Sequence, residues 1–248
     1  MTVCRNEFKR SEGIKIFVPA GSKIFEKRLE TTFPVENLLK WWCSRKNEFL
    51  RKYPWRLEND PYKVLLAEFL LQRTRRDVVV KIYQHLITKY PRPEDLANAD
   101  LAELMRLLEP LGLRKRVRYL LATVSELVNI KNKKPDYETL RKLPGVGDYI
   151  ASAVCIFALN QRRPLIDKNV ARIIIRFYGI MPKKPERPQD DPTIRTIIKK
   201  IMPETEFKEF NLALLDLAWE LCKPRKPRCE NCPIKAECKY FHELSQKD

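Results

Sequence analysis

Apolar residues recur three and four positions apart in many segments of the chain, the spacing that places them on one face of an α-helix. Prolines, glycines and charged residues separate these segments and end helices or form turns. The pattern predicts an all-α protein. Its predicted helices begin near Phe33, cover about 61–74, 77–90 and 95–108, start again near Val117, flank a glycine turn at 143–147, and continue from Asp167 to Gly179.

The glycine turn, Leu-Pro-Gly-Val-Gly, gives a helix–hairpin–helix pattern. Gly145 and Gly147 allow positive φ and the close approach of a foreign backbone. The amides of the hairpin, that of Val146 included, and the N-terminus of the next helix would then face outward as an anion site that suits a DNA phosphate. Two glycines alone do not exclude an ordinary turn between helices.

The predicted helix at 61–74 is apolar nearly all round, which is typical of a buried helix. Asp60 or Asn59 would cap it, and Pro61 suits its first turn. Glu68 lies in the middle of this helix, where a carboxylate is costly unless it is paired or protonated. Buried carboxylates are candidates for function, and a structural ion pair with a nearby arginine explains the pattern equally well.

Asp167 follows the apolar pair Leu165-Ile166 and stands where a helix begins. Aspartate is a preferred N-cap residue, so the pattern alone is explained by a helix cap.

Four cysteines near the C-terminus are separated by six, two and five residues: Cys222, Cys229, Cys232 and Cys238. Tetrathiolate sites hold zinc or an iron–sulfur cluster, and the spacing does not choose between them. Four unbound thiols in so short and hydrophilic a segment are a poor alternative. The sequence therefore predicts a metal-containing site here.

The chain has 49 Lys and Arg against 32 Asp and Glu, a net charge of +17 over 248 residues. Such an imbalance favours a polyanionic partner, nucleic acid first and an acidic membrane surface second. Arg114 and Lys115, at a looser turn, would meet phosphate, although a solvated face is equally compatible. No apolar run approaches the ~20 residues of a membrane span, and the N-terminus is unlike a signal peptide. We therefore expect an intracellular protein.

The segments LPGVGDY and PLIDKNVARI resemble the helix-hairpin-helix DNA glycosylases, the superfamily of endonuclease III and adenine-DNA glycosylase. The resemblance implies an all-α, two-lobed fold with DNA in the cleft and a flipped base in a pocket. In that family the hairpin grips the DNA backbone, and the aspartate, here Asp167, stabilises the oxocarbenium-like sugar or activates the attacking water. The segment PWRLENDPYKVLLAEFLLQRT resembles adenine and archaeal thymine-mismatch glycosylases; by that resemblance Glu68 lines the base pocket, and Gln72 and Arg73 fill the gap in the DNA.

Family members that also cut the strand carry a nucleophilic lysine two residues past the second hairpin glycine. Tyr149 stands there, and a tyrosine hydroxyl cannot form a Schiff base, so the resemblance implies a monofunctional enzyme without lyase activity. A packing aromatic is the alternative for Tyr149. This tyrosine resembles the archaeal thymine-mismatch enzymes, whereas adenine enzymes more often have a small residue and usually a C-terminal recognition domain, which this sequence lacks. We expect an enzyme that removes thymine or uracil opposite guanine. The alternatives are an enzyme that removes adenine opposite oxidised guanine, and a mismatch-directed deaminase or non-catalytic mismatch binder.

The cysteine spacing is that of the [4Fe–4S] loop in the endonuclease III class, so the resemblance implies this cluster, in a structural role. It further implies a monomer acting on double-stranded DNA. We expect a helical bundle at 58–161, a cluster domain of 34–57 with 162–248, and an N-terminal extension of unknown role at 1–33.

Overall fold

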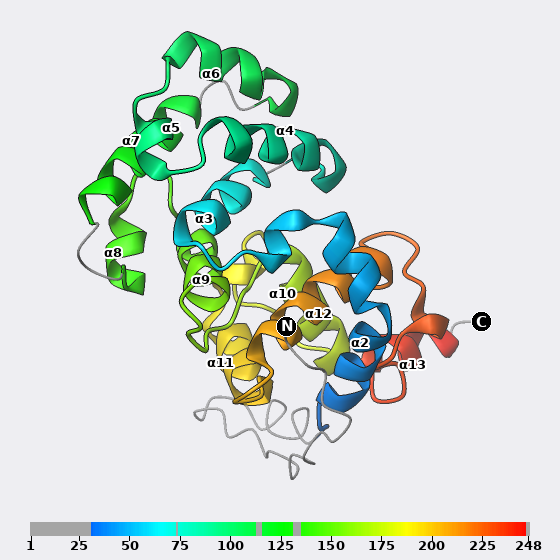
Figure 1. Cartoon of the computed structure of the whole chain (residues 1–248). Helices are drawn as coiled ribbons and strands as arrows, with labels where there is room; N and C mark the ends of the chain where they lie inside the picture. The colour runs from blue at the N-terminus through cyan, green and yellow to red at the C-terminus, as the bar shows by residue number, and fades with distance from the viewer. Residues whose placement is uncertain (1–30, 73, 113–115, 131–134, 247–248) are drawn as a thin grey trace. The chain divides into compact units, whose positions relative to one another are not determined.

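The computed structural model describes residues 31–72, 74–112, 116–130 and 135–246, and every regular element among them is helical. The described residues form two compact units, one within residues 47–162 and one that combines residues 31–46 with 163–246 (Figure 1). None of the described helices has the length and apolar character that a membrane span requires.

The unit of residues 47–162 contains nine α-helical and 3-10 segments among its described residues, besides the end of α2 (Val35–Lys52). They are η1 (Pro54–Leu57), α3 (Pro61–Leu70), α4 (Arg76–Lys89), α5 (Pro93–Ala97), α6 (Leu101–Leu108) with η2 (Glu109–Leu111), α7 (Val117–Asn129), α8 (Tyr137–Lys142) and α9 (Asp148–Phe157). Helix α3 packs against α4, α7 and α9, so it lies at the centre of this unit (Figure 1).

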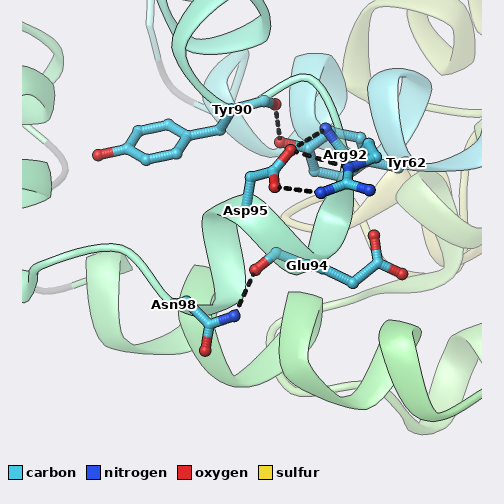
Figure 2. A network of polar contacts seen from close by, with 6 residues as sticks. All are labelled: Tyr62, Tyr90, Arg92, Glu94, Asp95 and Asn98. Atoms are coloured by element: carbon cyan, nitrogen blue, oxygen red, sulfur yellow. Dashed lines mark hydrogen bonds and ion pairs between the residues drawn. The ribbon is translucent and has the colours of Figure 1, made fainter.

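The single helix expected over 95–108 is wrong, because the structure has two helices there, α5 and α6. Asp100 is the reason: its carboxylate accepts a hydrogen bond from the N–H of Glu103 at 2.7 Å and starts a new helix at Leu101. Figure 2 shows the connection between α4 and α5, where the Tyr62 hydroxyl donates a hydrogen bond to the Tyr90 carbonyl at 2.8 Å. This hydrogen bond ties the start of α3 to the end of α4.

The other unit contains the beginning of α2, then α10 (Lys168–Tyr178), η4 (Pro188–Asp190), α11 (Pro192–Ile201), α12 (Phe207–Glu220), η5 (Cys229–Asn231) and α13 (Lys239–Ser245). Helix α10 packs against α11, α12 and α13. The Phe33 and Phe177 rings lie 4.7 Å apart, and Trp42 Nε1 donates to the buried Asp216 carboxylate at 2.9 Å. The Trp42 side chain is buried.

Candidate functional site

Glu68 lies near the end of α3 and is only 7% exposed. The helix begins as expected, because the Asp60 carboxylate accepts a hydrogen bond from the Tyr62 N–H at 2.8 Å and Pro61 occupies the first position. All residues from Val64 to Leu70 are buried. The sequence therefore places a carboxyl group inside an otherwise apolar helix, where its desolvation is costly, and this makes Glu68 a candidate functional residue.

The glycine hairpin after α8 is packed onto α3 and α7. Gly145 has φ +74°, in the left-handed region, and a Cβ there would lie 3.3 Å from both Phe69 Cε2 and Tyr119 Cβ. The Thr123 hydroxyl lies between the carbonyl oxygens of Tyr119, at 2.6 Å, and Pro144. Only glycine meets both demands at position 145 without strain.

Two details of the hairpin differ from the expectation. Gly147 has φ −85° and ψ 177°, an ordinary extended conformation, so the expected positive φ is right for Gly145 and wrong here. The N–H of the buried Val146 donates to the Leu143 carbonyl at 3.1 Å, so it is used inside the hairpin. The open part of the hairpin is Gly147, the N-cap residue of α9, where a Cβ would meet no atom within 4 Å.

Tyr149 lies in the first turn of α9 and packs, half-buried, against the apolar core of its unit. Gln72 lies in the turn after α3, which ends at Leu70, earlier than predicted. Its backbone and side-chain oxygens both accept hydrogen bonds from Arg116. Three further candidates, Arg73, Arg114 and Lys115, lie outside the described residues.

Asp167 belongs to the other compact unit, where it is the N-cap residue of α10. One carboxylate oxygen accepts from the N–H of Val170 at 2.7 Å and of Asn169 at 2.9 Å; the other accepts from Asn169 Nδ2 at 2.7 Å. The side chain is partly exposed. The helix-cap explanation is therefore correct geometrically, and the cap also fixes the position of a partly exposed carboxylate.

A chain of hydrogen bonds runs from Asp167 toward the cysteine segment. Asn169 donates to Asp167 and accepts from Arg172 at 2.9 Å, and Arg172 Nε donates to the Cys222 carbonyl at 2.9 Å. Burial lowers the pKa of the Arg172 guanidinium, and the nearby Cys222 and Asp167 oppose that shift. The carboxylate and the first cysteine of the predicted metal site are thus joined by two side chains.

Asn211 on α12 holds the extended segment that leads to Asp167. It is fully buried, accepts from the Leu165 N–H at 2.8 Å, and donates to the carbonyls of Arg163 at 3.1 Å and Phe207 at 2.7 Å. The sequence pattern does not single out Asn169 or Arg172. For Asn211 it offers one signal, an asparagine inside the apolar stretch 210–218, since a buried amide must find partners.

The four predicted cysteine ligands line one pocket, whose other walls are mostly apolar. The Arg176 guanidinium also lines this pocket: it lies 3.5 Å from Cys222 Sγ and donates to the Lys223 carbonyl at 2.7 Å. Among the described residues, no three His, Cys, Asp or Glu side chains are grouped closely enough to hold a metal ion as they stand. The donor set, four thiols and an adjacent guanidinium, fits an anionic thiolate-bound cluster.

The thiols influence one another electrostatically. Burial, followed by the charges of the neighbouring cysteines, raises the pKa of Cys232 to about 12. Burial raises the pKa of Cys229 and Cys238 as well. Without a bound cation these groups therefore hold their protons at neutral pH, and a metal that binds their thiolate forms must displace those protons.

Comparison with known proteins assigns the family. A family model described as HhH-GPD superfamily base excision DNA repair protein matches residues 66–202. The chain is 38% identical over 210 residues to a thymine-DNA glycosylase of Aeropyrum pernix, covering 83% of this chain and 92% of that protein. The chain belongs to the HhH-GPD superfamily of base excision DNA repair proteins.

Two further relatives of this HhH-GPD protein differ in the base that their names give. A thymine/uracil-DNA glycosylase of Pyrobaculum aerophilum is 36% identical over 216 residues, covering 85% of this chain and 92% of that protein. An adenine DNA glycosylase of Mycobacterium tuberculosis is 34% identical over 204 residues, covering 80% of this chain but 64% of that protein.

A solved structure of a thermostable thymine-DNA glycosylase has a TM-score of 0.76 at 29% identity, over 84% of this HhH-GPD chain and 95% of that chain. The predicted all-α glycosylase fold is therefore confirmed.

Proposed function

We propose that this HhH-GPD protein is a monofunctional DNA glycosylase that removes thymine or uracil mispaired with guanine. The relatives that match nearly their full length carry thymine or uracil in their names, and this is the observation that carries the proposal. In this proposal the protein binds double-stranded DNA as a monomer and draws the target nucleotide out of the helix, because the glycosidic bond is inaccessible within the stack.

The proposed chemistry gives each candidate residue a separate task. Glu68 lines the base pocket and hydrogen-bonds the extruded base, Tyr149 packs beside it, and Asp167 faces the deoxyribose. As the base departs, positive charge develops on the sugar, and a fixed carboxylate stabilises that charge. Water then completes the displacement. The network through Asn169 and Arg172 supports this assignment, since it holds the Asp167 carboxylate in one orientation.

The cysteine pocket is proposed to hold a [4Fe–4S] cluster through Cys222, Cys229, Cys232 and Cys238. When bound, the cluster cross-links the segment between α12 and α13 and thereby orders its basic residues. In this proposal those residues contact DNA phosphates, and the cluster has a structural role.

A panel of duplexes, each with one mispair, tests the proposed reaction. We expect the protein to release thymine from T·G and uracil from U·G, to leave alkali-labile abasic sites, and to give no covalent adduct when borohydride is added, because Tyr149 cannot form an imine. Released bases are identified by chromatography. Adenine release opposite 8-oxoguanine would favour the adenine-glycosylase alternative, and an altered base without an abasic site would mean deamination.

The two hairpin glycines should respond differently to alanine. Gly145→Ala should lower the free energy of unfolding by about 1–2 kcal/mol, because a side chain at φ +74° is strained and its Cβ would crowd Phe69 and Tyr119. Gly147→Ala should unfold like the wild type, since its φ is ordinary and its Cβ would stand in open space. The Gly147→Ala substitution should nevertheless weaken binding to duplex DNA several-fold, because its methyl group would stand where the DNA backbone is proposed to approach the hairpin.

Thermal unfolding and fluorescence anisotropy with a labelled duplex measure the two effects separately. Unchanged DNA affinity in the Gly147→Ala protein would contradict the proposed contact between this hairpin and the DNA backbone.

A further inference from the structure

The turn after α3 is tied to the residue that precedes α7. Arg116 Nη1 lies 2.9 Å from Gln72 Oε1 and 3.3 Å from the Gln72 carbonyl oxygen. The two residues are 44 positions apart in the chain, in the same compact unit. A single guanidinium nitrogen therefore contacts both the backbone and the side chain of one glutamine.

The chemistry of this contact fixes the conformation of the glutamine. Nη1 of arginine carries two hydrogens, so it can donate one to each oxygen. Both hydrogen bonds have a charged donor, which makes them stronger than bonds between neutral groups. A glutamine side chain normally samples many rotamers and loses entropy when it is ordered. Here that entropy is already lost in the protein without DNA.

We propose that Arg116 is a positioning residue that presets the Gln72 side chain for entry into the DNA. The inference rests on the proposed function and on the role that the family resemblance implies for Gln72, which is to fill the gap in the DNA left by the extruded base. Gln72 follows Glu68 by four residues, just beyond the end of α3. A rigid glutamine at this place lowers the cost of stabilising the extruded state, because less ordering remains to be done when DNA binds.

A phosphate-binding role is the alternative for Arg116, because the contact with Gln72 uses only Nη1 and leaves the Nε and Nη2 donors of a partly exposed side chain. The salt dependence of DNA binding separates the two roles. A phosphate contact would add to the salt dependence of DNA binding, by about 0.9 in the slope of log K against log salt for each contact. If Arg116 is a positioning residue, its substitution changes the equilibrium of base extrusion and leaves the salt slope of DNA binding unaltered.

A second link between the same segments provides a matched control. The Thr74 hydroxyl lies 3.4 Å from the Leu111 carbonyl and 3.3 Å from the Gln72 carbonyl, so these hydrogen bonds involve backbone oxygens and not the side-chain oxygen of Gln72. Thr74→Val therefore loosens the connection between the two segments while the hydrogen bond from Arg116 to Gln72 Oε1 is retained.

The test uses the full-length protein and a duplex with 2′-fluoro-deoxyuridine opposite guanine, which resists excision, and 2-aminopurine beside it to report unstacking. We expect Arg116→Met to reduce the equilibrium constant for extrusion roughly five- to tenfold, the scale of the net contribution of one hydrogen bond. The salt slope should match that of the wild type. In a Gln72→Ala background, Arg116→Met should have no further effect on extrusion.

Three results would each overturn the inference. The first is an equal loss of extrusion in Thr74→Val, which would mean that Arg116 only connects the two segments. The second is a salt slope for Arg116→Met that is reduced by about one phosphate contact, and the third is the full effect of Arg116→Met in the Gln72→Ala background. Excision from T·G and U·G duplexes by the wild type is scored separately. Its absence would count against the proposed function, whereas the extrusion signal reports on Arg116 whether or not the bond is cut.

Discussion

Replacing Asp167 with asparagine should lower the rate of base excision about a thousandfold, the scale seen when a group that stabilises transition-state charge is removed. The substitution removes the negative charge and keeps the shape. Asparagine caps helices about as well as aspartate, so the N–H groups of Asn169 and Val170 retain an acceptor. We therefore expect little change in unfolding temperature and in DNA affinity. Single-turnover excision with saturating enzyme measures the rate of the chemical step.

Asp100→Asn is a matched control for that experiment. Asp100 also caps a helix, accepting from the Glu103 N–H at 2.7 Å, but it is exposed and lies in the other compact unit. This variant should excise at the wild-type rate. If Asp167→Asn retains more than about a tenth of the activity, the charge at position 167 is not what stabilises the sugar. If both variants lose activity alike, a general effect of the substitution is responsible.

Local signals in the sequence were sufficient for much of the fold. The start of α3 followed from Asp60 and Pro61, because capping and proline preferences act over a single helical turn. The burial of α3 followed from its apolar composition. The hairpin was recognised from its two glycines, although only Gly145 needs a left-handed backbone. Apolar periodicity does not predict the break between α5 and α6, because it carries no information on an N-cap residue such as Asp100.

The contacts that position the candidate site residues cannot be predicted from local sequence, because they join residues that are far apart in the chain. Arg116 contacts Gln72 across 44 residues, and Arg172 contacts Cys222 across 50. The sequence offers many arginines with the same local context, and only the packing of the helices selects which of them meets which acceptor. Asn211 is similar, since its partners Arg163 and Leu165 precede it by more than forty positions. Residue chemistry thus suggested what the site contains, whereas tertiary structure determines how its groups are held.

Replacing Cys232 with serine should remove most of the iron from the purified protein and lower its free energy of unfolding by about 4 kcal/mol or more, as the loss of a structural metal centre does. Cys232 lines the cysteine pocket with Cys222, Cys229 and Cys238. Serine is a poor ligand for this class of cluster, since its oxygen is harder than a thiolate and retains its proton at neutral pH. Iron and sulfide analysis, visible absorption and chemical unfolding measure the effect, and DNA affinity should fall with the loss of order in the basic segment.

The pKa of Cys232 adds a pH dependence to this prediction. In the metal-free protein burial raises that pKa from 9.0 to about 12. Since the raised value means tighter proton binding in the folded state, the metal-free protein loses stability as the pH rises above 9. Metal binding requires the thiolate, so cluster loading releases protons and becomes more favourable over the same rise in pH. The loaded protein holds Cys232 as a thiolate, so its stability should rise up to pH 9 and then stay level, while that of the metal-free protein falls above pH 9.

Cys155→Ala is the control for the cysteine experiment, because Cys155 is buried in α9 and does not line the cysteine pocket. It should cost some stability through the small cavity that it leaves, while iron content stays at the wild-type level. Equal iron in the Cys232→Ser and wild-type proteins would exclude Cys232 as a ligand. If instead purified wild-type protein contains zinc and no sulfide, the four cysteines form a single-metal site, and the cross-link between α12 and α13 would come from that ion.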